Sequence, residues 1–313
     1  MYGKFLIFSG QSHRRLAEDI CAHLGLRVGE STTIKFSNEN LMVQIEENVR
    51  EADVFVVQTA APPLHENIFE LLIMLDALKS ASAARVTAVI PYFPYVRSDK
   101  KDRPRISITA RLMADLITAA GADRVLTMDL HAAQIQGFFR CPADQLQAIN
   151  LMCDHLKRRD LTDAVLVASD AGEAKDVARY TNRLDLPMAI IDKRRDGDDE
   201  DPRAAHIIGD IKGRSCILVD DEIASGGTLL RATELLLERG AREVCGVATH
   251  AVLSGRAIER IQSSPISEVI VTDTIPIPQE KRIDKLKVIS VARMLADAIR
   301  SIHDGTSVSA LFR

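Results

Sequence analysis

The chain has 313 residues, which is long enough for two domains of ordinary size, each with its own hydrophobic core. Its hydrophobic fraction of 46% and charged fraction of 27% are typical of a soluble globular protein, and no stretch approaches the ~20 apolar residues of a membrane span. With 40 Lys and Arg residues against 44 Asp and Glu residues, the net charge of -4 excludes the overall basic field that non-specific binding to nucleic acid requires. Neither nucleic acid nor a membrane is therefore an expected partner.

The cysteines and the N-terminal residues indicate where the protein works. The five cysteines show no CxxC spacing of the kind that binds metals, and three of them lie in or beside apolar runs. We therefore expect reduced, mostly buried thiols and a cytoplasmic protein. The first apolar run, residues 4–8, is too short for the core of a signal peptide and predicts a strand instead.

Short apolar runs rich in Val and Ile alternate along the chain with segments of helical spacing. The predicted strands are residues 4–8, 53–58, 85–91, 124–129, 164–168, 187–191, 215–220, 243–249, 268–272 and 286–291. The predicted helices are residues 16–24, 68–78, 110–120, 177–184, 229–237 and 294–302. This alternation predicts an α/β fold of mainly parallel sheets flanked by helices, and the length fits two sheets better than one. We expect an N-terminal domain over residues 1–148 and a C-terminal domain over residues 149–313, with the last helix as a candidate to pack back on the first domain.

A basic segment follows the strand predicted at residues 85–91. Five of the nine residues from 97 to 105 are Lys or Arg, and Tyr92, Phe93 and Tyr95 come just before them. Cations and aromatic rings at the carboxyl end of a buried strand suit the phosphates and the base of a nucleotide. A solvated charged loop is the alternative interpretation.

Two strands end on residues that can bind a metal ion. Asp129 and His131 stand at the end of one strand, and Asp170 follows the strand at residues 164–168. Carboxylate oxygens are hard ligands that suit Mg²⁺. A lone histidine is more often structural than a ligand, so the first pair leaves both interpretations open.

Three cations, Lys193, Arg194 and Arg195, follow the strand at residues 187–191. The stretch from 194 to 203 has no apolar residue, which predicts an exposed and mobile loop. Mobile cations can stabilise the charge of a transferring phosphoryl group in the transition state. The alternative is that these cations only neutralise the acidic residues beside them.

The most specific pattern lies at residues 216–228, where an apolar strand is joined to a helix by a tight polar turn. Asp220 and Asp221 stand at the end of the strand, where they can accept hydrogen bonds from sugar hydroxyls or bind Mg²⁺. In the turn, Gly226 and Gly227 let backbone N–H groups approach an anion, and the neighbouring hydroxyls and the helix N-terminus suit a phosphate. For the Gly-Gly pair alone, an ordinary glycine-containing turn is the alternative.

The sequence Val-Asp-Asp-x-x-x-Ser-Gly-Gly-Thr at residues 219–228 resembles the ribose-5-phosphate loop of the type I phosphoribosyltransferase fold. From Phe5 almost to Phe312 the chain resembles the ribose-phosphate pyrophosphokinase family, above all at residues 70–74, 87–93, 121–127, 130–139 and 271–276. The resemblance implies two similar phosphoribosyltransferase-like domains. It also implies a transferase that moves the pyrophosphoryl group of ATP to the C1 hydroxyl of ribose 5-phosphate, giving phosphoribosyl pyrophosphate and AMP.

The resemblance assigns roles to matching positions. It implies ATP contacts from a segment that reaches the adenine site of a neighbouring subunit, Phe36, Asn38, Glu39 and Asn40, and from Arg97, Ser98, Asp99 and Lys100. It implies Mg²⁺ ligands at His131 and Asp170 and mobile catalytic cations at Lys193 and Arg195. It implies ribose 5-phosphate contacts from Arg195, Asp220, Asp221, Ala224, Ser225, Gly226, Gly227 and Thr228. It further implies dimers that assemble into a hexamer.

Several positions depart from the usual pattern of this family. Asn40 replaces a carboxylate, Ser98 replaces glutamine, and Ala224 and Ser225 replace an Asp-Thr pair. Two alternatives to an active pyrophosphokinase therefore stay open. One is a catalytically silent homologue that regulates a partner, and the other is a phosphoribosyltransferase, whose loop often has Ala-Thr-Gly-Gly-Thr. The charged residues retained throughout the site favour the active enzyme.

Overall fold

The computed structural model describes residues 3–192 and 206–309, and it divides the chain into two compact units. Unit 1 consists of residues 1–147, 274–276 and 290–313, and unit 2 consists of residues 148–273 and 277–289. The chain therefore leaves unit 1, builds unit 2 and returns to unit 1 at its C-terminal end.

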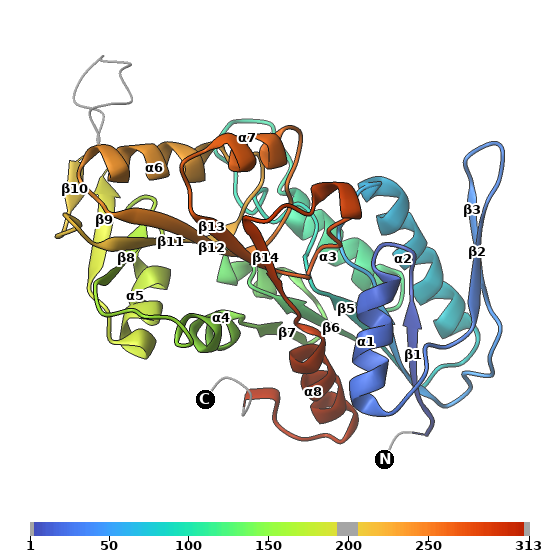
Figure 1. Ribbon diagram of the computed structural model, residues 1–313. Coiled ribbons are helices and arrows are strands. Elements are labelled where there is room, and N and C mark those ends of the chain that lie inside the picture. The colour runs from blue at the N-terminus through green and yellow to red at the C-terminus, as the bar shows by residue number, and fades with distance from the viewer. Residues whose placement is uncertain (1–2, 193–205, 310–313) are drawn as a thin grey trace. The chain divides into compact units, whose positions relative to one another are not determined.

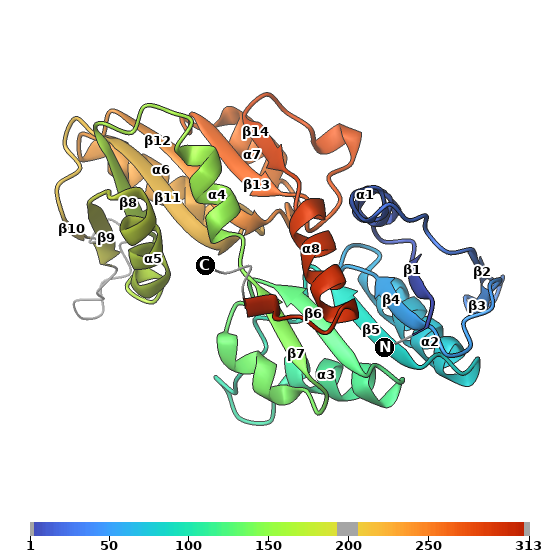
Figure 2. The same cartoon turned by 90° about the horizontal axis from the view of Figure 1, so that it is seen from below.

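Unit 1 contains a five-stranded parallel sheet (Figure 1). In spatial order its strands are β1 (Phe5–Ser9), β4 (Asp53–Val57), β5 (Arg85–Ile90), β6 (Arg124–Met128) and β7 (Ala143–Leu146). One face is covered by α2 (Leu64–Ser80) and α3 (Thr109–Ala119), and the other by α1 (Arg14–Leu24) and α8 (Ala292–His303) (Figure 2). Because helices cover both faces, the interior strand β4 is buried along its whole length, which explains its apolar run from Val54 to Val57.

An antiparallel hairpin of β2 (Ser31–Lys35) and β3 (Leu41–Ile45) lies beside α2 (Figure 1). The carboxylate of Glu70 on α2 is buried, and its Oε1 accepts a hydrogen bond from Thr33 Oγ1 at 2.7 Å. Its Oε2 accepts hydrogen bonds from the backbone N–H of Gln11 at 2.9 Å and from Gln58 Nε2 at 2.6 Å. Glu70 therefore ties the hairpin to the chain that follows β1 and to the end of β4.

Glu70→Gln is expected to loosen this hairpin. The change removes the negative charge that accepts three hydrogen bonds, and hydrogen bonds to charged groups contribute about 1.5–3 kcal/mol each. Backbone amides of residues 31–45 should then exchange with deuterium about 10-fold faster or more in native conditions. The matched control is Glu66→Gln on the same helix, because Glu66 pairs with Lys35 in an ion pair that is 35% and 44% exposed. Equal exchange in the natural protein and the Glu70→Gln variant would contradict the prediction.

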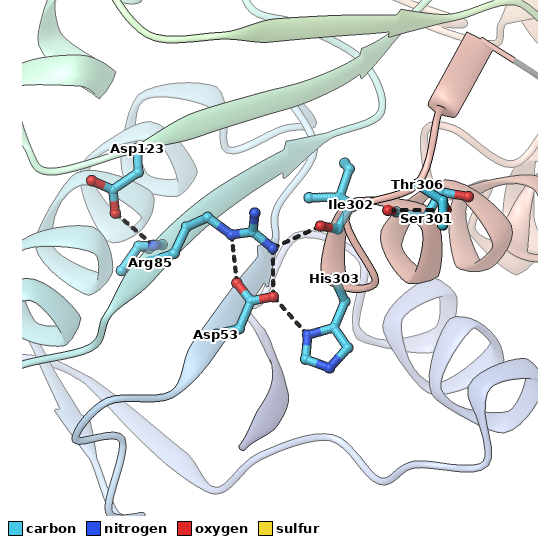
Figure 3. A network of polar contacts seen from close by, with 8 residues as sticks. Asp53, Arg85, Asp123, Ser301, Ile302, His303 and Thr306 are labelled. Atoms are coloured by element: carbon cyan, nitrogen blue, oxygen red, sulfur yellow. Dashed lines mark hydrogen bonds and ion pairs between the residues drawn. The ribbon is translucent and has the colours of Figure 1, made fainter. Parts of the chain in front are cut away.

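A polar cluster fixes the end of α8 to the strands of unit 1 (Figure 3). Asp53 has no exposed surface, and Arg85 Nε and Nη2 donate hydrogen bonds to its two oxygens at 2.7 and 2.6 Å. His303 Nδ1 lies 2.7 Å from Asp53 Oδ2, and Arg85 Nη2 also donates to the carbonyl of Ile302 at 2.9 Å. The His303 ring stacks on Phe5 with ring centroids 4.2 Å apart. One buried carboxylate thus joins α8 to the sheet.

Unit 2 contains a seven-stranded sheet in the described part of the chain. In spatial order its strands are β10 (His206–Ile208), β9 (Met188–Asp192), β8 (Ala164–Ala168), β11 (Ser215–Glu222), β12 (Glu243–His250), β13 (Glu268–Thr272) and β14 (Leu286–Ile289). The pair β10 and β9 is antiparallel and the other pairs are parallel. One face is covered by α6 (Gly227–Glu238) and α7 (Ala257–Ser263), and the other by α4 (Ile149–Leu156) and α5 (Ala174–Leu184) (Figure 1). Short 3-10 helices complete the units, η1 (Ala133–Phe138) in unit 1 and η3 (Gln279–Lys281) in unit 2.

The predicted fold class is confirmed, since both units are α/β with mainly parallel sheets flanked by helices. Every strand predicted from an apolar run is present, whereas β2, β3, β7 and β10 were not predicted. Strands β2 and β7 each contain a single large apolar residue, Ile34 and Leu146, so they produce no apolar run. No helix in the described ranges combines the length and the apolarity that crossing a membrane requires.

Candidate active site

The turn between β11 and α6 has the geometry of a phosphate-binding loop. Gly226 precedes α6 in the left-handed conformation, with a φ of 74° that favours glycine. The Ser254 N–H donates a hydrogen bond to the Ala224 carbonyl at 2.9 Å, which holds the start of the loop. Within the described part of the chain, the N–H groups of residues 224–228 donate no backbone hydrogen bond. The loop therefore presents a row of donors, at the positive end of a helix, to an anion.

Two carboxyl groups stand beside this loop, because Asp220 and Asp221 are near the end of β11. The Asp221 N–H donates to Asp220 Oδ1 at 2.9 Å. Burial, followed by the neighbouring Asp221 carboxyl and the charge of Glu173, raises the pKa of Asp220 to about 8. Asp220 therefore keeps a proton at neutral pH in the free protein. A protonated carboxyl donates as well as accepts hydrogen bonds, so this pair can bind sugar hydroxyls in both ways.

Asp170 lies at the same edge of this sheet, because it follows β8, the parallel neighbour of β11. Its Oδ1 accepts hydrogen bonds from the N–H groups of Gly172 at 2.9 Å and Glu173 at 3.3 Å. These bonds hold the carboxylate in the turn that leads into α5. The structure thus gathers three predicted carboxyl residues, Asp170, Asp220 and Asp221, at one edge of unit 2.

The predicted nucleotide segment of unit 1 lies between β5 and α3. Ser98 Oγ accepts a hydrogen bond from the Thr109 N–H at 3.3 Å, so its hydroxyl fixes the start of α3. Asp99 is 8% exposed and accepts a hydrogen bond from Gln134 Nε2 at 3.2 Å. These two side chains hold the segment in place. All five cations of the segment are exposed, namely Arg97, Lys100, Lys101, Arg103 and Arg105.

His131 follows β6 and is exposed. Gln134, three residues later in η1, bonds to Asp99, so the structure brings the His131 segment next to residues 97–100. His131 belongs to unit 1 and Asp170 belongs to unit 2. In residues 3–192 and 206–309, no three His, Cys, Asp or Glu side chains gather as a metal site.

The turn of the β2–β3 hairpin carries the other predicted nucleotide residues, Phe36, Asn38, Glu39 and Asn40. The Phe36 ring is 47% exposed. The Asn40 N–H donates to Asn38 Oδ1 at 3.2 Å, which shapes the turn. Glu39 and Asn40 line a cavity of about 800 Å³ together with the start of α2. An exposed aromatic ring beside amide groups is suited to binding a nucleobase.

Two arginines that the sequence pattern did not single out lie beside the phosphate loop. Arg260 on α7 donates a hydrogen bond from Nη1 to the Ser225 carbonyl at 3.3 Å. Arg231 stands four residues after Gly227 on α6, and this spacing is the signal that could have placed it over the loop. Lys193 and Arg195, the predicted catalytic cations, lie outside the described residues, and β9 ends directly before them.

In the part of the chain that the structure describes, parallel strands end in carboxyl groups beside a loop whose N–H groups have no backbone partner and which leads into a helix. This arrangement defines an α/β enzyme of the phosphoribosyltransferase class. Residues 5–121 match the model of the N-terminal domain of ribose phosphate pyrophosphokinase, and residues 199–313 match that of the phosphoribosyl synthetase-associated domain. The chain belongs to the ribose-phosphate pyrophosphokinase family, which confirms the resemblance seen in its sequence.

Relatives of this family are similar to the chain over nearly its whole length. The ribose-phosphate pyrophosphokinase of Caldanaerobacter subterraneus subsp. tengcongensis is 52% identical over 98% of this chain and 97% of its own. That of Deinococcus radiodurans is 50% identical, with the same coverage. The crystal structure of phosphoribosylpyrophosphate synthetase from Mycobacterium smegmatis is 41% identical, with a TM-score of 0.92 over 97% of this chain and 100% of its own. The family consists of transferases of the kinase type, which generally use a metal ion.

Proposed function

We propose that the protein transfers the β,γ-pyrophosphoryl group of ATP to the C1 hydroxyl of ribose 5-phosphate, with Mg²⁺ as cofactor. The observation that carries the proposal is the loop at residues 224–228, next to the two carboxyl groups of Asp220 and Asp221. Among the described residues, its N–H groups have no backbone acceptor. Family membership along the whole chain supports the same reaction. The products are phosphoribosyl pyrophosphate and AMP.

In this proposal the sugar phosphate binds to unit 2. Ala224, Ser225, Gly226, Gly227 and Thr228 hold the 5-phosphate through their N–H groups and hydroxyls, while Asp220 and Asp221 bind the ribose hydroxyls. Binding the sugar at several points fixes the direction in which its C1 hydroxyl points. Positioning of this kind lowers the barrier because it removes the entropy cost of aligning the two reactants.

ATP is assigned to residues of unit 1. Phe36, Asn38, Glu39 and Asn40 contact the adenosine part, and Arg97, Ser98, Asp99 and Lys100 form the segment at the phosphates. Arg97 and Lys100 supply the exposed positive charge, whereas Ser98 and Asp99 act through the hydrogen bonds that hold the segment. The hairpin turn is assigned to the nucleotide of a neighbouring subunit, so we propose a homo-oligomer of dimers assembling into a hexamer. We also propose that the protein works in the cytoplasm.

His131 and Asp170 are proposed as Mg²⁺ ligands. The Asp170 carboxylate fits a hard cation, because two backbone N–H groups already fix its orientation, and exposed His131 offers a ring nitrogen. A bound Mg²⁺ would neutralise charge on the phosphate oxygens of ATP.

The reaction needs no covalent enzyme intermediate. The C1 oxygen forms a bond to the β-phosphorus, the bond from that phosphorus to the α,β-bridging oxygen breaks, and AMP leaves with this oxygen. The hydroxyl proton passes to solvent. Lys193 and Arg195 are proposed to neutralise the charge that gathers on the transferring group, and Arg195 also to contact the sugar phosphate.

The test is the release of AMP. Purified protein with ATP, Mg²⁺ and ribose 5-phosphate should release AMP and form an equal amount of phosphoribosyl pyrophosphate. The control omits ribose 5-phosphate and should show only the hydrolysis blank. If the complete mixture gives no AMP above this blank, the proposal fails and a silent regulatory homologue is favoured. Release of pyrophosphate from phosphoribosyl pyrophosphate and a nucleobase would instead identify a phosphoribosyltransferase.

A further inference from the structure

The side chain of Arg231 runs back along α6 toward the phosphate loop. A β-carbon built on Gly227 would lie 3.4 Å from Arg231 Nη1, 4.0 Å from its Cζ and 3.7 Å from Ser225 Oγ. This proximity follows from helix geometry, because residues four apart share a face and side chains lean toward the N-terminus. The space beside Gly227 is therefore bordered by a guanidinium and a hydroxyl, both of which are hydrogen-bond donors.

Within the described ranges, no acidic residue pairs with this guanidinium. The first turn of α6 contains no Asp or Glu. Arg231 is exposed, and it forms no ion pair or hydrogen bond with any residue in the described ranges. Glu234 stands on the next turn of the same helix and is likewise exposed, yet no ion pair joins the two in those ranges. The charge of Arg231 is thus available to an anion at the loop.

Acidic groups near the phosphate loop make a cation at this position favourable for phosphate binding. The acidic residues Asp221 and Glu173 stand beside the Asp220 carboxyl, and negative charge there opposes the binding of a dianionic phosphate. Arg260 already uses Nη1 to hold the Ser225 carbonyl, which fixes the backbone of the loop. Arg231, in contrast, lies on the side where Gly227 leaves space. A guanidinium offers two parallel N–H donors that match two oxygens of one phosphate group.

We infer that Arg231 is a further ligand of the 5-phosphate, which it binds together with the loop N–H groups and the Ser225 hydroxyl. This inference rests on the proposed function of the loop as a ribose 5-phosphate site. It assigns to α6 a cation that offsets the carboxyl groups at the edge of the sheet.

The test measures binding directly and does not depend on turnover. Ribose 5-phosphate is titrated calorimetrically into the natural protein, Arg231→Ala, Arg231→Lys and the control Glu234→Gln, and thermal unfolding confirms that each variant is folded. Loss of a charged hydrogen-bond donor should raise the dissociation constant of Arg231→Ala about 10-fold to 100-fold. Arg231→Lys should retain part of the affinity, because it keeps the charge but not the two parallel donors. Glu234→Gln should stay within about twofold of the natural protein.

The possible outcomes distinguish a failure of the inference about Arg231 from a failure of the proposed reaction. If Arg231→Ala binds ribose 5-phosphate within twofold of the natural protein, or if the natural protein does not bind it, the inference is overturned. If the natural protein binds the sugar phosphate, loses affinity in Arg231→Ala and yet releases no AMP, the inference stands and the proposed reaction fails. Ribose without the phosphate serves as a second probe, and Arg231→Ala should not change its binding.

Discussion

Lys193→Ala should lower the rate of AMP release at saturating substrates by about 100-fold to 1,000-fold, while the protein stays folded. The expected loss is large because a cation at this position would act mainly in the transition state, where charge spreads over the oxygens of the transferring group. Lys193 lies outside the described residues, directly after β9, the strand that leads into this basic stretch. The rate is measured from initial AMP formation with ATP, Mg²⁺ and ribose 5-phosphate.

The control for this experiment is Lys157→Ala. Lys157 is an exposed lysine just after α4 in the same unit, so its removal changes the net charge by the same amount. Its rate should stay within about twofold of the natural protein, since single exposed charges contribute little. A rate for Lys193→Ala within fivefold of the natural protein would remove this residue from the catalytic role. A lost rate together with a lowered melting temperature would show a folding defect instead.

Asp53→Ala should destabilise unit 1 by about 3–5 kcal/mol, because it leaves a buried charge without its partner. The Arg85 side chain is 13% exposed and loses both hydrogen bonds to the carboxylate, and His303, 19% exposed, loses its link to the sheet. Asp53→Asn should cost less, since one amide oxygen still accepts a hydrogen bond. A chain with two units need not unfold in one step, so we expect hydrogen exchange of the β4 and β5 amides to report the loss best.

An exposed ion pair in the same unit provides the comparison for Asp53. Asp19 pairs with Arg15 on α1, with side chains 35% and 79% exposed. Asp19→Ala should cost about 0.5 kcal/mol or less. If Asp53→Ala and Asp19→Ala change the exchange of β4 and β5 equally, the buried cluster does not stabilise unit 1 as its geometry predicts.

The strands that the sequence predicted share one physical property. β4, β8 and most of β11 are buried on both faces, so each contains four or five consecutive apolar residues that local sequence reveals. β2 and β10 were missed because most of the residues in each strand are exposed. Their pairing depends on partners far away in sequence or on a turn, neither of which leaves an apolar run.

The residues of the candidate site and its surroundings also differ in whether local sequence predicts them. The loop at residues 220–228 was predictable because its carboxyl groups, glycines and hydroxyls are contiguous. The role of Glu70 was not predictable, because its carboxylate bonds to Gln11, Thr33 and Gln58, which come from three separate segments. No sequence spacing indicates these contacts. Arg231 lies within a helix that its apolar spacing predicts, and that spacing does not distinguish one exposed arginine from another. The roles of Lys193 and Arg195 stay predictions.

The path of the chain sets an order of events on the ribosome. Residues 148–273 and 277–289, the whole of unit 2, are synthesised before α8, although α8 belongs to unit 1. Unit 2 can therefore complete its core while translation continues. The sheet of unit 1 is fully covered on one face only when Leu295 and Ile299 of α8 have been made. Until α8 forms, the part of that face which α1 does not cover stays exposed to solvent and to other nascent chains. The half-made protein should thus need chaperone protection mainly for its N-terminal part, until α8 has formed.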